Sequence, residues 1–272
     1  MEKEIAEILA VLGHPQRLAV FRLLTRRYPD QLPAGEIGQI LGLRPSTLSA
    51  YLAALMQTGL LAKERVGTSL LYRIEMEVVQ TTFGFLLDDC CRGRVSDCLS
   101  LAPRKPARRY RVLFVCTGNS ARSIFAEALL RELGADRFEV HSAGTHPGSM
   151  INPQTVTLLQ QQCHDVGGLF SKDLGSLADE PPFDFVFTVC DLAANEDCPA
   201  LPGRPVSGHW GVPDPVARAA QARSPAEAAL AFREAYGALR RRIEAFIALP
   251  LESLDRLAVQ RAVDDIARRE GH

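Results

Sequence analysis

The chain has 272 residues and a mass of 29.8 kDa, which is long for one average domain and sufficient for two. Its apolar fraction of 47% and charged fraction of 23% are ordinary for globular proteins and exclude a disordered tail protein or a collagen-like repeat. No apolar run reaches the roughly 18–20 residues that a membrane-spanning helix needs, and the charged start lacks a signal-peptide layout. Seven cysteines cannot all pair within one chain, so we expect reduced thiols in a cytoplasmic protein without membrane association.

The charge distribution divides the chain into two parts. Residues 1–109 carry 15 Lys and Arg against 11 Asp and Glu, whereas residues 110–272 carry 16 against 21. The boundary is the segment SLAPRKPARR, in which two prolines and a basic cluster interrupt the hydrophobic pattern. We therefore expect a domain at 1–99, a linker at 100–109 and a second domain at 110–272.

The first part has the pattern of a winged helix-turn-helix, an α+β fold. Helical spacing begins at Ile5, and Pro15 opens a second helix. A short helix at 34–41 ends at Gly42, and the segment RPSTLSAYLAALMQTG predicts the next helix. The alternation in LLAKERVGTSLLYRI then predicts a β-hairpin wing.

In a helix-turn-helix, the exposed face of the second helix enters the major groove of DNA. The candidate DNA contacts on this helix and on the wing are Arg44, Ser46, Thr47, Ser49, Tyr51, Arg65 and Arg73. A helical dimerisation module without DNA contact is the alternative. The stretches GHPQRLAVFRLL and GEIGQILGLRPSTLSAYLAALMQTGLL resemble the ArsR-type repressors, although Tyr51 stands where many relatives have His. This resemblance implies a homodimer that binds a two-fold symmetric operator.

A cysteine cluster follows the wing, in the segment DDCCRGRVSDC. Cys90 and Cys91 are adjacent, and Gly93 allows the chain to turn back and present Cys98. Three converging thiolates suit trivalent arsenic or antimony, whereas zinc normally takes four ligands. The cluster also resembles the metalloid site of one branch of these repressors, where the ion is a regulatory ligand. Buried structural cysteines are the alternative.

The second part opens on an apolar run, RVLFVC, typical of a strand buried in a parallel sheet. A tight loop and the helical pattern SIFAEALLREL follow at once, an arrangement that binds oxyanions through main-chain N–H groups. Cys116 at the head of this loop is the expected nucleophile, with a thiolate stabilised by the loop dipoles. The expected oxyanion-binding residues are Thr117, Gly118, Asn119, Ser120, Ala121, Arg122 and Ser123. Arg122 can bind two anion oxygens, Ser123 can hydrogen-bond the thiolate, and Asn119 can hold the loop's shape.

Further candidates for chemistry lie downstream of the loop. Asp214 in HWGVPDP is the expected general acid, with a structural Asp-Pro turn as the alternative. Cys190 ends a buried strand, and Cys198 follows eight residues later. A phosphatase has no need of these extra thiols, but a reductase needs them for thiol exchange. Cys163 lies in the helical pattern LLQQQCHDV, and we expect it to pack against neighbouring side chains and to take no part in the chemistry.

The whole of residues 110–256 resembles the low-molecular-weight tyrosine phosphatase fold, in its arsenate reductase branch. The stretches that carry this resemblance are VLFVCTGNSARS, FTVCDLAANEDCP, HWGVPDP and LPLESLDRLA. It implies an α/β domain with a central four-stranded parallel sheet. Val216-Ala217 stands where tyrosine phosphatases of this fold usually have aromatic residues, which favours a small inorganic anion as substrate.

The combined hypothesis is a metalloid-responsive repressor fused to an arsenate reductase that needs no cofactor beyond a thiol reductant. Cys190 or an external thiol such as glutathione resolves the thiol-arsenate adduct on Cys116, and Cys198 passes the disulfide to thioredoxin or glutaredoxin. One alternative is a phosphatase acting on phosphotyrosine or a small phosphoester. Another is a repressor whose second domain is inactive and only senses an oxyanion.

Overall fold

The computed structural model describes residues 2–90, 109–196 and 203–268, and its contacts divide the chain into two compact units. Unit 1 comprises Met1–Ala102 and unit 2 comprises Pro103–His272. In these described ranges, no helix combines the length and the apolar character needed to cross a membrane.

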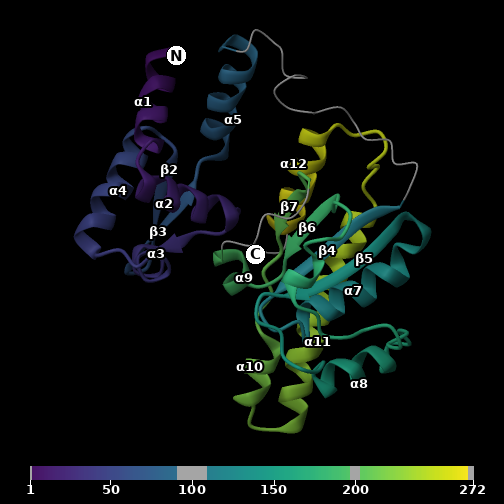
Figure 1. The fold of residues 1–272 in the computed structure, drawn as a ribbon. Helices are drawn as coiled ribbons and strands as arrows, with labels where there is room; N and C mark the ends of the chain where they lie inside the picture. Colours follow the sequence, from purple (N-terminus) through teal and green to yellow (C-terminus); the bar gives the residue numbers. More distant parts are fainter. Residues whose placement is uncertain (1, 91–108, 197–202, 269–272) are drawn as a thin grey trace. The chain divides into compact units, whose positions relative to one another are not determined.

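Unit 1 combines helices with a small antiparallel sheet (Figure 1). Its elements in chain order are α1 (Glu2–Leu12), α2 (Pro15–Arg26), β1 (Leu32–Pro33), α3 (Ala34–Leu41), α4 (Pro45–Gln57), β2 (Leu61–Val66), β3 (Ser69–Ile74), α5 (Met76–Phe85) and η1 (Leu86–Cys90). The sheet has the strand order β1-β3-β2. Gly42 ends α3 in the left-handed conformation, at φ 62°, which glycine adopts without steric cost.

Helix α4 contributes one face to the core of unit 1. Leu48, Leu52 and Leu55 are buried, and they pack with Leu24 and Ile37 in the core of this unit. The β2–β3 hairpin turns at Gly67, as the sequence predicts. Helix α5 was not predicted, because its sequence MEVVQTTFGF mixes β-branched and aromatic residues that are weak helix formers.

Unit 2 is built on a parallel four-stranded sheet with the order β5-β4-β6-β7 (Figure 1). Its elements are β4 (Tyr110–Cys116), α7 (Arg122–Leu133), η2 (Ala135–Arg137), β5 (Phe138–Gly144), α8 (Pro153–Gln161), η3 (Leu174–Leu177), β6 (Phe185–Thr188), α9 (Asp191–Asn195), β7 (Val206–His209), α10 (Pro215–Ala220), α11 (Pro225–Ile247) and α12 (Arg256–Arg268). The predicted parallel sheet is confirmed. Every residue of β4 is buried, as expected of a central parallel strand.

The candidate site residues follow the carboxyl ends of the strands, and helices pack against the sheet. Helix α7 packs against β4, β5 and α11, and α12 packs against β7. The close approach of α12 requires Gly208 in β7, since a Cβ there would lie 2.7 Å from Cγ1 of Val263. The carboxyl ends of β4, β6 and β7 lead into the segments that hold Cys116, Cys190 and Asp214. Parallel α/β sheets bind their ligands at this end.

Candidate active site

The loop that joins β4 to α7 lines a pocket of about 250 Å³. The residues that line this pocket are Cys116, Thr117, Gly118, Ser120, Ala121, Arg122, Leu192, Asp214 and Val216. The structure thus brings together the predicted nucleophile, the predicted anion-binding arginine and the predicted acid, although they come from segments nearly a hundred residues apart.

The sulfur of Cys116 lies inside the turn of the loop. The main-chain N–H of Asn119 donates to Cys116 Sγ at 3.1 Å, and Ser123 Oγ lies 2.9 Å from the same sulfur. Because Ser123 Oγ also accepts a bond from Asn119 Nδ2, its own proton is available to the sulfur. Two donors therefore converge on Cys116, as an oxyanion-binding loop with a cysteine nucleophile requires.

The pKa of Cys116 is set by two opposing effects, burial of the sulfur and the stabilisation of its thiolate by the loop. Burial raises the pKa of this thiol, and the hydrogen bond from Ser123 and the positive charge of Arg122 lower it by less than burial raises it. The nearby Cys190 thiol raises it further. The main-chain N–H of Ser123 also lowers this pKa, as the predicted stabilisation by the loop requires, but the net direction is upward because the residue is only 2% exposed.

Asn119 holds the loop in shape through its backbone and its carboxamide. Its φ of 42° lies in the left-handed region, which few residues other than glycine adopt. Its Nδ2 donates to Ser123 Oγ and Ser142 Oγ, both at 2.8 Å, and its Oδ1 accepts from the N–H of Lys172 at 2.7 Å. The side chain is fully buried, so these bonds form in a low-dielectric surrounding that strengthens them.

A buried carboxylate extends this network below the loop. Glu127 of α7 is fully buried, accepts a bond from Ser142, and pairs with Arg131 and with Lys172 Nζ at 3.3 Å. Sequence reasoning missed this network. The available signal was one carboxylate in the otherwise apolar run SIFAEALL, because a buried charge needs partners.

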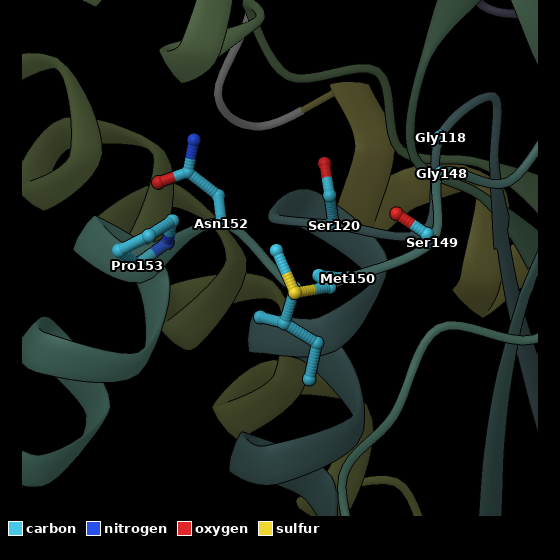
Figure 2. Close-up of a pocket in the computed structure, with 8 residues that line it drawn as sticks. Gly118, Ser120, Gly148, Ser149, Met150, Asn152 and Pro153 are labelled. Atoms are coloured by element: carbon cyan, nitrogen blue, oxygen red, sulfur yellow. The ribbon is translucent and has the colours of Figure 1, made fainter.

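The segment after β5 binds the carbonyl groups of the loop. The N–H groups of Thr145, His146, Gly148 and Asn152 donate to the carbonyls of loop residues at 2.9 to 3.2 Å. Gly144 permits this contact, since a Cβ there would lie 2.6 Å from the Thr117 carbonyl oxygen. A second pocket of about 370 Å³ lies between the loop and this segment, with Met150 exposed in it (Figure 2).

Arg122 and Asp214 form an ion pair beside the pocket. Arg122 Nη2 donates to Asp214 Oδ2 at 2.7 Å, and Nη1 donates to the Val212 carbonyl at 3.2 Å. These bonds use two of the five N–H donors of the guanidinium. The other oxygen of Asp214, Oδ1, caps α10 by accepting from the N–H of Val216 at 2.9 Å.

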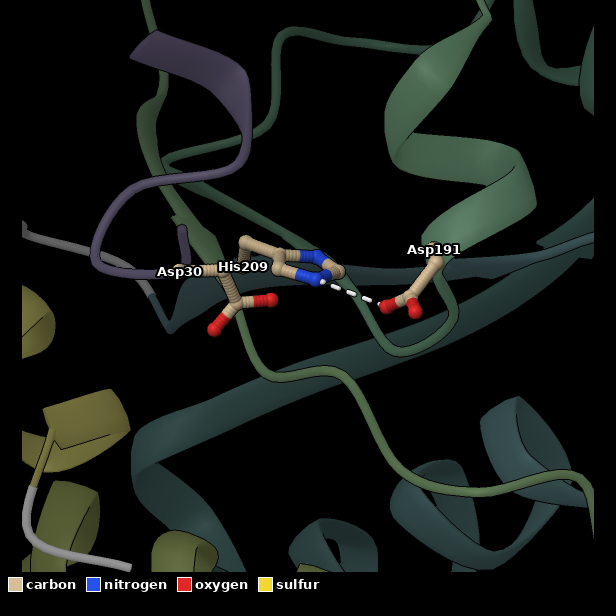
Figure 3. Close-up of side chains that lie close together, drawn as sticks. All are labelled: Asp30, Asp191 and His209. Atoms are coloured by element: carbon tan, nitrogen blue, oxygen red, sulfur yellow. Dashed lines mark hydrogen bonds and ion pairs between the residues drawn. The ribbon is translucent and has the colours of Figure 1, made fainter. Parts of the chain in front are cut away.

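The second buried thiol lies next to the loop. Cys190 caps the N-terminus of α9, where its Sγ accepts from the N–H of Ala193 at 3.4 Å and lies 3.4 Å from Thr117 Oγ1. The following residue, Asp191, is bonded to His209 Nε2 at 3.2 Å, which ties the start of α9 to β7 (Figure 3). Cys198 lies outside the described residues.

The prediction that Cys163 packs on a helix is wrong. Helix α8 ends at Gln161, and Cys163 follows it as an exposed residue at φ 64°. The polar run of three glutamines offered no apolar position at which the helical pattern could be checked.

In unit 1 the structure describes all seven candidate DNA contacts. Arg44, Ser46 and Ser49 are exposed in or beside α4. Tyr51 is partly covered and donates its hydroxyl to Gln16, and Arg73 pairs with Glu75 at 2.9 Å. Thr47 lies in the first half of α4, and Arg65 is exposed on β2.

Of the predicted metalloid ligands, Cys91 and Cys98 lie outside the described residues, and Cys90 is described by its backbone alone.

Comparison with known proteins identifies relatives of unit 2. Residues 111–258 match the family model for low molecular weight phosphotyrosine protein phosphatase. Arsenate reductase 2 of Staphylococcus saprophyticus is 33% identical over 107 residues, which are 39% of this chain and 79% of that protein. The arsenate reductase of Shouchella clausii is 36% identical over 104 residues, 38% of this chain and 73% of that one.

A solved structure also resembles part of the chain. The transcriptional repressor BigR from Xylella fastidiosa has 28% sequence identity and a TM-score of 0.27. The match covers 33% of this chain and 89% of that one.

The contact between Ser123 and Cys116 generates a prediction about pH. Since the folded pKa of Cys116 is raised, its thiolate fraction and its rate of alkylation increase as the pH rises toward and through that pKa. Ser123→Ala removes a hydrogen bond to the thiolate worth about 1.5–3 kcal/mol, so the profile shifts about 1–2 pH units higher. The measurement is iodoacetamide labelling between pH 6 and 10, with the Cys116 peptide quantified by mass spectrometry.

The exposed Cys163 in the same samples is the internal control, and its profile should be the same in both proteins. Superimposable Cys116 profiles for wild type and Ser123→Ala would show that the hydroxyl does not stabilise the thiolate.

Proposed function

The chain belongs, through residues 111–258, to the low molecular weight phosphotyrosine protein phosphatase family, and from this membership we propose that unit 2 is an arsenate reductase. The single observation that carries the proposal is the second buried thiol beside the nucleophile. Cys190 Sγ lies 3.4 Å from the hydroxyl of Thr117, the residue that follows Cys116. A phosphatase does not use such a thiol, whereas reduction of arsenate consumes one.

In the first step, the anion-binding loop holds arsenate, whose charge and tetrahedral shape resemble those of phosphate. The thiolate of Cys116 attacks arsenic, an As–O bond breaks, and Asp214 donates the proton with which that oxygen leaves as water. The product is a Cys116 thiol-arsenate adduct. Arg122 and the N–H groups of the loop stabilise the negative charge on the remaining oxygens.

In the second step, a thiolate attacks the sulfur of Cys116. An S–S bond forms and the S–As bond breaks, and its electron pair stays on arsenic, which is thereby reduced from the pentavalent to the trivalent state. Arsenite leaves, and the protein retains a disulfide. We assign the attack to Cys190 or to an external thiol such as glutathione, with Cys198 passing the disulfide to thioredoxin or glutaredoxin.

The pocket rim supports a small anion as the substrate. Leu192 and Val216 line the pocket beside the loop, and Leu192 is 64% exposed. Neither side chain offers an aromatic face on which the ring of phosphotyrosine could stack. A phosphatase acting on phosphotyrosine or a small phosphoester is the competing function, and it predicts activity that survives loss of Cys190 and Cys198. An inactive oxyanion sensor predicts no turnover of either substrate.

For unit 1 we propose a DNA-binding repressor that acts as a homodimer. We interpret helices α3 and α4, which are joined through the left-handed Gly42, as the helix-turn-helix, and the β2–β3 hairpin would be its wing. The support is the exposed polar side of α4, which carries Ser46 and Ser49, opposite its buried leucines. Arg44 at the start of α4 and Arg65 on β2 would then meet phosphates of operator DNA.

We further propose that Cys90, Cys91 and Cys98 bind trivalent arsenic or antimony as the regulatory ligand. The support is the sequence spacing of three thiols and the chemistry of the proposed enzyme, which releases the same ion. An ion that binds better to the DNA-free conformation lowers DNA affinity by the ratio of its two affinities.

The enzymatic proposal predicts a distinct effect for each thiol. Cys116→Ser abolishes arsenite production from arsenate, since serine is a far weaker nucleophile and cannot form the disulfide. Cys190→Ser with thioredoxin as the sole reductant reduces steady-state turnover at least about 100-fold, by loss of the resolving thiol. The measurement is arsenite released per protein in the presence of each reductant, with Cys163→Ser as the exposed-cysteine control. Full aryl phosphatase activity in Cys190→Ser together with no arsenite from wild type would favour the phosphatase.

The regulatory proposal predicts that DNA release does not depend on catalysis. Arsenite should release operator DNA from Cys116→Ser as it does from wild type, while Cys91→Ser should keep its DNA bound. Arg44→Ala should weaken DNA binding about 10-fold by loss of a phosphate or base contact. The measurement is fluorescence anisotropy with operator selected from random DNA, at fixed salt. Arsenite-dependent release that disappears in Cys116→Ser would contradict separate sites.

A further inference from the structure

The segment that leads from β7 to Asp214 is held by arginines at three consecutive carbonyl groups. Arg242 Nη1 donates to the carbonyls of Trp210 at 2.8 Å and Gly211 at 3.0 Å. Arg122 Nη1 donates to the next carbonyl, that of Val212, at 3.2 Å. Hydrogen bonds from a charged donor are about twice as strong as those between neutral groups.

The opposite side of this segment is bound to the end of β6. The N–H of Trp210 donates to the Thr188 carbonyl at 2.8 Å, and the N–H of Val212 donates to the Val189 carbonyl at 3.2 Å. The indole of Trp210 is fully buried and stacks on Phe187 with the ring centroids 3.9 Å apart. The segment is therefore fixed on both edges and through its largest side chain.

Arg242 is carried by a long helix that packs into the core of unit 2. It lies on the 23-residue helix α11, between the buried side chains of Leu239, Ile243 and Phe246. Phe246 also contacts the indole of Trp210, with ring centroids 5.9 Å apart. The helix thus fixes the guanidinium relative to the segment that it binds.

The two arginines differ in what else they must do. Arg122 lines the pocket and, in the proposed reaction, also binds the oxyanion through the N–H donors that Val212 and Asp214 leave unused. Arg242 does not line this pocket, because it reaches the segment from α11. We therefore expect the hydrogen bonds from Arg242 to the carbonyls of Trp210 and Gly211 to remain when an anion binds to Arg122.

We propose that Arg242 is a positioning residue, which keeps the Asp214 segment in place so that the carboxyl group faces the oxygen that leaves from arsenic. This inference rests on the proposed function. Proton transfer requires donor and acceptor within hydrogen-bond reach, and a displacement of about 1 Å can cost about 100-fold in rate. Arg242 is not among the residues that line the pocket around Cys116, so we assign its effect to the position of Asp214.

The test is a double-mutant cycle of Arg242→Met and Asp214→Asn in the full chain. With arsenate, Arg242→Met should lower kcat about 10- to 100-fold in wild type and by less than about 3-fold in Asp214→Asn, since a misplaced acid matters only where an acid is present. The inhibition constant for inorganic phosphate should change by less than about 3-fold, because the loop itself is intact. Arg242→Lys, which retains a charge and N–H donors, should recover part of kcat.

The matched control is Arg240→Met. Arg240 lies on the same helix in an exposed pair with Glu244, and its loss should change kcat by less than about 2-fold. An active wild type with an additive cycle, or a parallel loss of phosphate affinity in Arg242→Met, overturns the positioning role and leaves the proposed function standing. A wild type that reduces no arsenate with any thiol donor overturns the proposed function and this inference together.

Discussion

The catalytic unit depends on the hydrogen bond from the main-chain N–H of Asn119 to the sulfur of Cys116. This bond exists because Asn119 adopts a left-handed φ of 42°, which turns the chain around the sulfur. A non-glycine residue occupies this conformation only where its surroundings compensate for the strain. Here the compensation is the carboxamide, which binds Ser123, Ser142 and the main chain of Lys172. One side chain thus connects the nucleophile's position to α7, β5 and the segment before η3.

The buried network below the loop serves this constraint. Ser142 can accept the bond from Asn119 because its own hydroxyl donates a hydrogen bond to Glu127. Glu127 can be buried because Lys172 and Arg131 pair with its charge. Removal of one partner would leave a buried polar group unsatisfied, which costs about 1–3 kcal/mol. We interpret this network as the support of the loop conformation. It keeps the main-chain N–H of Asn119 bonded to the sulfur of Cys116 before the substrate binds.

The local features of the active site could be predicted from the sequence, and its long-range features could not. The strand, loop and helix around Cys116 are continuous in the chain, so their order and spacing predicted that Ser123 reaches the sulfur and that Asn119 shapes the loop. The raised pKa of Cys116 was missed because it arises from burial by segments remote in the sequence. Arg242 was missed for a similar reason. In the run LRRRIEAF, the sequence does not distinguish Arg242 from a surface arginine. Only the folded chain places it beside the carbonyl groups of Trp210 and Gly211.

In the proposed reaction, the loop above Cys116 binds a tetrahedral oxyanion. The most direct measurement is the rate at which iodoacetamide labels Cys116 in the full chain, with and without arsenate or phosphate, at a pH where the free protein is labelled readily. We predict that either anion slows the labelling of Cys116 at least several-fold and that chloride at equal ionic strength does not. Labelling of Cys116 that is equally fast at saturating anion would contradict the account.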